Sequence, residues 1–209
     1  MKRAVIVCTL LLALTVSALA DTASGALTKE ERTYLSQYLR ETREKFLQEL
    51  AGLSDAQMKF KPDAKSWSVF DIAEHLAKGE DVIYSLVTER IMKSPAQPEW
   101  KGEKGLRIKD LAVVMYLTNR ATNKLQAPEP VQPSGKFATK AEIITSFEKS
   151  RARTINYIET TEDDLRGHFR ENGIGVIDGY QWLLVVAAHT DRHLEQMREV
   201  KTHPNFPKK

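Results

Sequence analysis

Apolar residues recur every three or four positions in four long stretches of the chain, over about residues 29–50, 68–94, 139–160 and 180–201. This period places apolar side chains on one face of an α-helix and charged side chains on the other. The apolar positions expected to be buried are Leu35, Leu39, Phe46, Leu50, Val69, Ile72, Ala73, Leu76, Ile83, Val87, Ile143, Ile144, Phe147, Ile155, Ile158, Trp182, Leu183, Val186, Leu194 and Met197. Four amphipathic helices of this length predict an all-α four-helix bundle.

Two of these stretches begin with residues that favour the start of a helix. Ser68 precedes the second stretch and Asp71 follows three positions later, and Thr139 and Glu142 have the same spacing at the third. In a capping box, each of the two side chains accepts a hydrogen bond from the backbone N–H of the other residue. We therefore predict helices that begin directly after Ser68 and Thr139.

The second and third helices are joined by a long connection, from about residue 94 to residue 138. Five prolines lie in it, and residues 109–118 predict one short helix within it. Because bundle connections usually take about 2–8 residues, one of this length can cross the bundle, so the two helices need not be antiparallel. In the glycine-containing connection 161–178, only residues 174–177 suggest an extended segment.

The first twenty residues have the pattern of a signal peptide. Lys2 and Arg3 precede a nearly unbroken apolar run, and small residues at 18–20 favour cleavage before Asp21. Residues 21–209 are then expected to form a single domain that is exported, either periplasmic or secreted, with no membrane attachment after cleavage. Cys8 lies inside the apolar run, so the mature chain is expected to have no disulfide and no cysteine ligand.

The net charge argues against a nucleic-acid-binding protein. The chain has 31 basic and 28 acidic residues, a formal net charge of +3, and two of the positive charges lie in the predicted signal peptide. Proteins that bind nucleic acid carry a concentrated basic face, which a nearly balanced chain does not suggest. We expect a small-molecule substrate of unknown identity and no nucleic-acid partner.

Three of the five histidines are candidates for a metal site. His189 and His193 are four residues apart on the fourth predicted helix, so their rings lie one turn apart on the same face. His75 lies among apolar residues of the second helix, which directs its ring toward the interior. Three imidazoles that meet inside a bundle can hold a divalent ion and leave positions for water or substrate. Spacing alone also allows an ordinary pair of surface histidines and a hydrogen-bonded core histidine.

The residues around these histidines resemble the DinB-like superfamily of bacterial four-helix bundles. The similarity begins at residues 53–55, passes through 60–62 and the Trp67-Ser68-Val69 helix start, and reaches Glu74-His75-Leu76. It resumes at residues 164–165 and ends with the His-x-x-x-His and following Gln of residues 189–196. Each motif is weak alone, but three in the same order over about residues 29–201 are specific.

This resemblance implies a bundle in which the helices follow the order one, four, two, three. It also implies that His75, His189 and His193 are the ligands of a divalent metal ion, with zinc or nickel the metals reported in such proteins. Some relatives transfer or isomerise groups with the help of low-molecular-weight thiols, and others are described as metal-dependent hydrolases. Relatives often form dimers, so a homodimer is a possible partner state.

Two further residues are candidates for catalysis by a metal-dependent hydrolase. Such an enzyme activates a metal-bound water and needs a proton acceptor. Glu80, on the second helix, is a candidate general base if it faces the site, although carboxylates at such positions more often lie on the surface. Gln196 follows His193 by three residues and could orient a water or a histidine. The alternatives are a metal-binding or stress-related protein without catalytic activity and a thiol-dependent S-transferase, whose cytoplasmic cosubstrates fit poorly with export.

Overall fold

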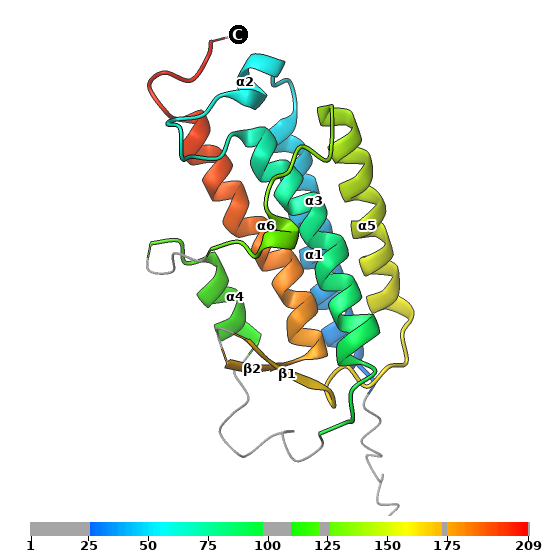
Figure 1. Ribbon diagram of the computed structural model, residues 1–209. Coiled ribbons are helices and arrows are strands. Elements are labelled where there is room, and N and C mark those ends of the chain that lie inside the picture. The colour runs from blue at the N-terminus through cyan, green and yellow to red at the C-terminus, as the bar shows by residue number, and fades with distance from the viewer. Residues whose placement is uncertain (1–25, 98–109, 122–125, 173–174, 209) are drawn as a thin grey trace, which may run out of the picture.

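The computed structural model describes residues 26–97, 110–121, 126–172 and 175–208. Four long helices form a bundle (Figure 1): α1 (Lys29–Leu50), α3 (Val69–Ser85), α5 (Lys140–Thr160) and α6 (Gly179–Lys201). The last turns of the second bundle helix are a π-helix, η1 (Leu86–Ile91), which continues directly from α3. The predicted four-helix bundle is confirmed, and the long helices begin and end within a few residues of the predicted positions.

The helices follow an unusual order around the bundle. α1 packs against α6, α6 against α3, α3 against α5, and α5 against α1. Helices α3 and α5 run in the same direction, as do α1 and α6 (Figure 1). Accordingly, Arg32 near the start of α1 donates to the carbonyl of Ile158 near the end of α5, whereas Lys201 at the end of α6 pairs with Glu49 at the end of α1. The crossover predicted between the second and third helices is therefore confirmed, as is the implied order.

Side-chain caps fix where the helices begin. Ser68 and Asp71 form the predicted capping box of α3, and the unpredicted boxes Thr28–Glu31 and Asp178–Gln181 start α1 and α6. At α5, Thr139 accepts from the backbone N–H of Glu142 as expected, but the Glu142 carboxylate accepts from the N–H of Ala138 at 2.9 Å. The capping box predicted for this helix is therefore incomplete, because the chain before Thr139 offers a competing donor.

Short elements occupy the connections. The short helix predicted at 109–118 is present as α4 (Asp110–Thr118), which packs along α6, and a 3-10 turn, η3 (Glu129–Val131), contacts α3. Sequence analysis missed α2 (Asp55–Lys59) and the strand β1 (Phe169–Asn172), which pairs antiparallel with β2 (Gly175–Asp178) in the region predicted to be extended. A five-residue helix and a polar strand show too little periodicity to be recognised.

A buried ion pair links all four long helices. The Arg151 guanidinium on α5 donates from Nε and Nη2 to the two carboxylate oxygens of Glu80 on α3, at 3.0 and 2.6 Å. It also donates to the Leu39 carbonyl and the Thr42 hydroxyl on α1, and to the Thr190 hydroxyl on α6, each at 2.7 Å. Arg151 is fully buried and Glu80 is 2% exposed. Each of the four long helices therefore contributes a group to this buried network.

The predicted signal peptide, residues 1–20 with Cys8, lies outside the residues that the structure describes. Within the described ranges, no helix combines the length and apolar character that crossing a membrane requires.

Candidate metal centre

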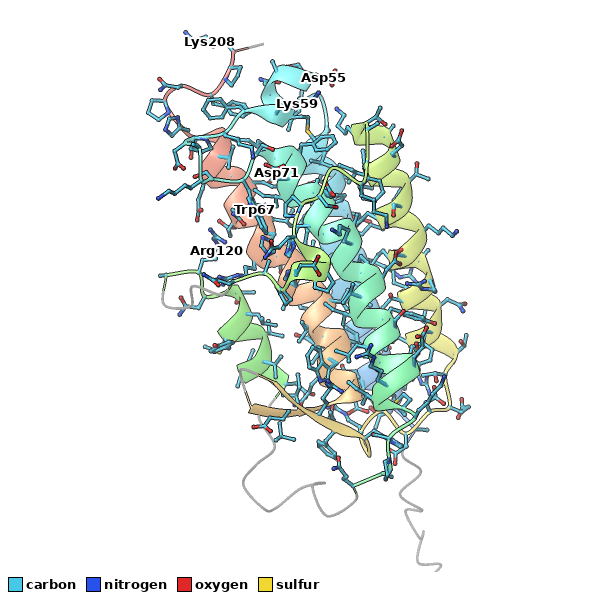
Figure 2. The ribbon with its side chains drawn as sticks, in the orientation of Figure 1. Asp55, Lys59, Trp67, Asp71, Arg120 and Lys208 are labelled. Carbon is cyan, nitrogen blue, oxygen red and sulfur yellow. The ribbon has the colours of Figure 1, made fainter. Side chains whose placement is uncertain are left out.

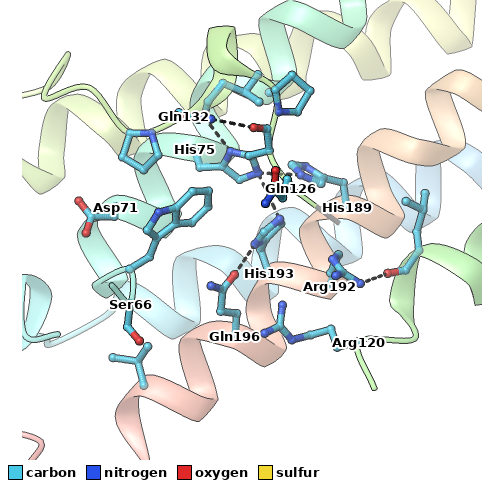
Figure 3. A pocket seen from close by; sticks show the side chains of 18 of the residues that line it. Ser66, Asp71, His75, Arg120, Gln126, Gln132, His189, Arg192, His193 and Gln196 are labelled. Atoms are coloured by element: carbon cyan, nitrogen blue, oxygen red, sulfur yellow. Dashed lines mark hydrogen bonds between the residues drawn. The ribbon is translucent and has the colours of Figure 1, made fainter. Parts of the chain in front are cut away.

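The structure brings the three predicted histidines together. His75 projects from α3, and His189 and His193 project from the facing side of α6 (Figure 3). The Nε2 atom of His75 lies 2.8 Å from Nε2 of His189 and 3.1 Å from Nε2 of His193. One ring nitrogen from each residue falls within 4.8 Å of the others. We call these three residues the histidine triad.

Hydrogen bonds at the outer ring nitrogens fix two of the rings. His75 Nδ1 donates to the carbonyl oxygen of Val131 at 2.7 Å, because that carbonyl can only accept. His193 Nδ1 lies 2.7 Å from Oε1 of Gln196 and donates to it. In the neutral form, each of these rings then carries its lone pair on Nε2, facing the other residues of the triad. Gln196 therefore orients a histidine, one of the two roles considered for it.

This set of donors suits a divalent cation. The Nε2 atoms of His75 and His193 lie 3.1 Å apart, and each carries a lone pair on the side that faces the other. A neutral His189 has one ring N–H group, so it can donate a hydrogen bond to only one of these two nitrogens. A tetrahedral ion with nitrogen ligands at about 2.0–2.1 Å separates those nitrogens by about 3.3 Å. The rings would move apart by only a few tenths of an ångström to accept it. The triad therefore fits zinc or a similar ion.

Burial keeps the triad in the neutral form that binds metal. Burial lowers the pKa of His75 and of His193, the latter to about 3, and lowers that of His189 well below its usual value. The neighbouring histidines lower the pKa of His189 and His193 further, and Arg120 and Arg192 add a smaller contribution at His193. Because protons compete with metal ions for imidazole, a folded site that disfavours protonation favours metal binding.

Glu74 holds the segment that orients His75. Its carboxylate accepts hydrogen bonds from the backbone N–H groups of Ser134, Gly135 and Lys136 at 2.9–3.2 Å. Burial alone would raise the pKa of Glu74, but these bonds lower it overall. Glu74, which sequence analysis named only within the Glu74-His75-Leu76 motif, lies about 100° around the helix from His75. Its carboxylate fixes the backbone that follows the Val131 carbonyl.

We predict that Glu74→Gln will weaken metal binding without unfolding the protein. The amide cannot accept three backbone N–H groups as a carboxylate does, so the Val131 carbonyl will lose its fixed position beside His75. Loss of such outer partners typically costs roughly 10–100-fold in metal affinity. Zinc affinity by competition with a chelator, alongside circular dichroism, checks this prediction. Glu142→Gln, at the start of α5, is the matched control, and equal zinc affinity in both variants would contradict the role of Glu74.

The triad lies in a cleft of about 1370 Å³ between α3, α6, the end of α4 and residues 126–133 of the crossover. Trp67, whose ring centroid lies 5.0 Å from that of His75, forms one wall. Trp67 and Arg120 both lie on the face of the bundle where α3 and α6 meet (Figure 2). Ser66 and Asp71 lie on one side of the triad, and Arg120 and Arg192 lie on the other (Figure 3). A bound ion would thus be accessible to a small molecule.

The structure does not support Glu80 as the general base. Glu80 is neither among the residues that line the cleft nor on the surface, since both its oxygens bind the buried Arg151. The physical reason is its position on the helix, because a residue five places after His75 lies about 140° around the axis from it. Gly79, four places after His75, occupies the triad's face instead.

The DinB superfamily model matches residues 38–197, which include the whole triad. The chain belongs to the DinB superfamily. The uncharacterized protein YuaE of Bacillus subtilis (strain 168) is 27% identical over 154 residues, which cover 73% of this chain and 88% of YuaE. Among solved structures, the chain resembles Bacillus subtilis YfiT, which is described as a probable metal-dependent hydrolase with an unusual four-helix bundle topology. The match has a TM-score of 0.53 and 15% identity, and it covers 87% of this chain and 92% of the YfiT chain.

These similarities support the fold and the family of this DinB-superfamily protein. At 15% identity, the likeness to YfiT concerns the bundle alone. The candidate metal centre rests on this chain's own triad and on the Val131 and Gln196 contacts that orient it. Sequence analysis could not find Val131, because a backbone carbonyl contributes regardless of its side chain.

Proposed function

We propose that this protein is a metal-dependent hydrolase that acts on a small molecule, with a zinc or nickel ion held by His75, His189 and His193. The observation that carries the proposal is the convergence of three neutral imidazoles in a cleft large enough for a substrate. The description of YfiT as a probable metal-dependent hydrolase agrees with it. We also propose that the protein is exported and acts outside the cytoplasm, on the pattern of residues 1–20.

Different residues of the cleft would have different roles in such an enzyme. A divalent ion in a site of this kind lowers the pKa of a bound water and polarises a substrate carbonyl. Val131 and Gln196 hold the rings of His75 and His193 in the orientation that ligation requires. Trp67 covers one side of the triad and excludes solvent there. Positive charge on Arg120 and Arg192 favours any negative charge that develops in the cleft.

A thiol-dependent transferase is a second candidate. Among the described residues that line the cleft, the carboxylates are Asp71 and Glu199, and these pair with Lys61 and Arg120. This part of the lining therefore offers no unpaired carboxylate as a general base. Thiol chemistry needs none, because a metal-coordinated thiol loses its proton outright. The predicted export weighs against this candidate, since low-molecular-weight thiol cosubstrates are cytoplasmic.

The two activities can be separated with one panel of substrates. Zinc-loaded and nickel-loaded protein will be assayed with esters and amides, each with and without glutathione or cysteine. We expect metal-dependent cleavage that needs no thiol and disappears in His193→Ala. Turnover only with a thiol would favour the transferase, and full metal occupancy without turnover across the panel would favour a binding protein without catalytic activity.

A further inference from the structure

The cleft changes character along its length. Helices α3 and α6 are antiparallel neighbours, and both contribute lining residues on either side of the triad. Toward the end of α3 and the start of α6, the lining is apolar. In the opposite direction, toward the start of α3 and the end of α6, it is polar and charged. A molecule that spans the triad therefore meets two different environments.

The apolar end consists of Val82, Ile83 and Leu86, which follow the triad on α3 and η1, and Trp182 of α6. Ile83 and Trp182 pack in the same hydrophobic cluster. Val82 is 41% exposed, so its side chain offers apolar surface to a ligand in the cleft. From His75 to Val82 the helix rises about 10 Å, so this end extends well beyond the metal centre.

Gly79 separates this end from the triad and leaves the passage between them open. It lines the cleft one turn after His75 on α3. A Cβ atom at this position would lie 3.4 Å from Cε1 of His189, in contact with a metal ligand. Any larger side chain would thus fill the space beside the triad, on the way to Val82.

The basic groups lie beside the triad and beyond it. Arg192, adjacent to His193, is held by a hydrogen bond from Nη1 to the Leu117 carbonyl at 3.0 Å. Arg120, after the end of α4, forms a two-pronged pair with Glu199 of α6 at 2.9 and 3.1 Å. The described lining contains four cationic side chains and two carboxylates, a net positive charge: Lys61, Lys65, Arg120 and Arg192 against Asp71 and Glu199. A guanidinium has five N–H donors, and Glu199 accepts from two of those on Arg120, so a guanidinium held in this way can still donate to carboxylate or phosphate oxygens of a ligand.

We propose that this cleft takes an amphipathic anion, with an apolar chain or ring along Val82 and Trp182 and an acidic group at Arg120 and Arg192. The bond to be cleaved would lie between these parts, at the triad. This last point rests on the proposed hydrolase function, whereas the preference for an amphipathic anion rests only on the lining of the cleft.

The test is a binding measurement with alkyl sulfonates, which are strong anions but weak metal ligands. Full-length, zinc-loaded protein is titrated calorimetrically with octanesulfonate, with the shorter butanesulfonate, and with the neutral octanol. Each buried methylene contributes about 0.8 kcal/mol, and a hydrogen bond to a charged group contributes more than a neutral one. We therefore expect octanesulfonate to bind at least roughly tenfold more tightly than either of the others.

Two variants assign this preference to the two ends. Val82→Glu will weaken octanesulfonate binding roughly tenfold and leave butanesulfonate binding nearly unchanged. Because Val82 is 41% exposed, the substitution should leave the protein folded. Arg120→Gln will weaken both sulfonates and leave octanol unchanged. The matched controls are Leu111→Glu on the outer face of α4, where Leu111 is 64% exposed, and Arg40→Gln on α1, which pairs with Glu159 away from the cleft.

The outcomes separate this proposal from the proposed function. Equal affinity for octanesulfonate and octanol, equal affinity for the two sulfonates, or variants that bind like their controls would overturn the amphipathic anion. A protein that binds no metal yet ranks the ligands as expected supports the amphipathic cleft and contradicts the hydrolase. If the protein cleaves esters but prefers neither the anionic ligand nor the longer chain, this inference is wrong and the proposed hydrolase function is unaffected.

Discussion

Replacing His193 with alanine will reduce the metal content of the purified protein from about one ion per chain to a small fraction of that. The remaining pair, His75 and His189, comes from two different helices and offers an ion only two nitrogens. The affinity should therefore fall by more than the roughly 10–100-fold that loss of an outer partner costs. Elemental analysis of protein prepared without a histidine tag, after incubation with zinc or nickel and desalting, measures the effect.

A histidine outside the triad provides the matched control. His203 also lines the cleft but does not belong to the group of three ring nitrogens. The variant His203→Ala should retain the full metal content, as should the wild type. If the wild type takes up neither zinc nor nickel, or if His193→Ala retains its ion, the triad is not a metal site.

Replacing Arg151 with methionine will lower the free energy of unfolding by about 3–5 kcal/mol, the usual effect of removing one partner of a buried ion pair. The Glu80 carboxylate would stay buried without its guanidinium, and the Leu39 carbonyl and the hydroxyls of Thr42 and Thr190 would lose a donor. For a domain of this size, the loss corresponds to a decrease of roughly 10 °C in Tm. Urea and thermal unfolding followed by circular dichroism provide the measurement.

The same two helices carry an exposed ion pair that serves as the control. Arg153 on α5 donates to Asp81 on α3 at 2.8 Å, and both side chains are 43% exposed. Removing it with Arg153→Gln should cost no more than about 1 kcal/mol. The double variant Glu80→Leu/Arg151→Met should recover most of the lost stability, because it leaves no buried charge. Equal effects of Arg151→Met and Arg153→Gln would show that burial does not decide the contribution of these pairs.

The helices could be predicted from the sequence because their signals are local. The apolar period of α1 and the Ser68–Asp71 cap depend on residues within one or two turns of each other, and both appear in the structure as predicted. The length of the crossover indicated that neighbouring helices need not be antiparallel. What it could not indicate is the path of that segment, because η3 contacts α3 through residues far apart in the sequence, such as Val131 and His75, which are 56 positions apart.

The residues of the candidate site also differ in whether the sequence near them carries a signal. The spacing of His189 and His193 could be read from one helix, and the apolar neighbours of His75 directed its ring toward the interior, but only the resemblance to a family indicated that all three bind the same ion. The error at Glu80 arose because sequence separation was used without the angle around the helix, and because its partner Arg151 is 71 residues away. The role of Glu74 was missed for a related reason: its three donors are backbone groups, which carry no signature in the sequence.

A metal ion bound by the triad would also restrict the unfolded chain. His75 and His189 are 114 residues apart, so an ion that joins them closes a very long loop. For a covalent cross-link, a loop of about 100 residues corresponds to about 4.7 kcal/mol of lost chain entropy in the unfolded state. No cysteine occurs in the described part of the chain. The metal-loaded protein would thus have a reversible substitute for a disulfide, one that a chelator and not a reductant would open.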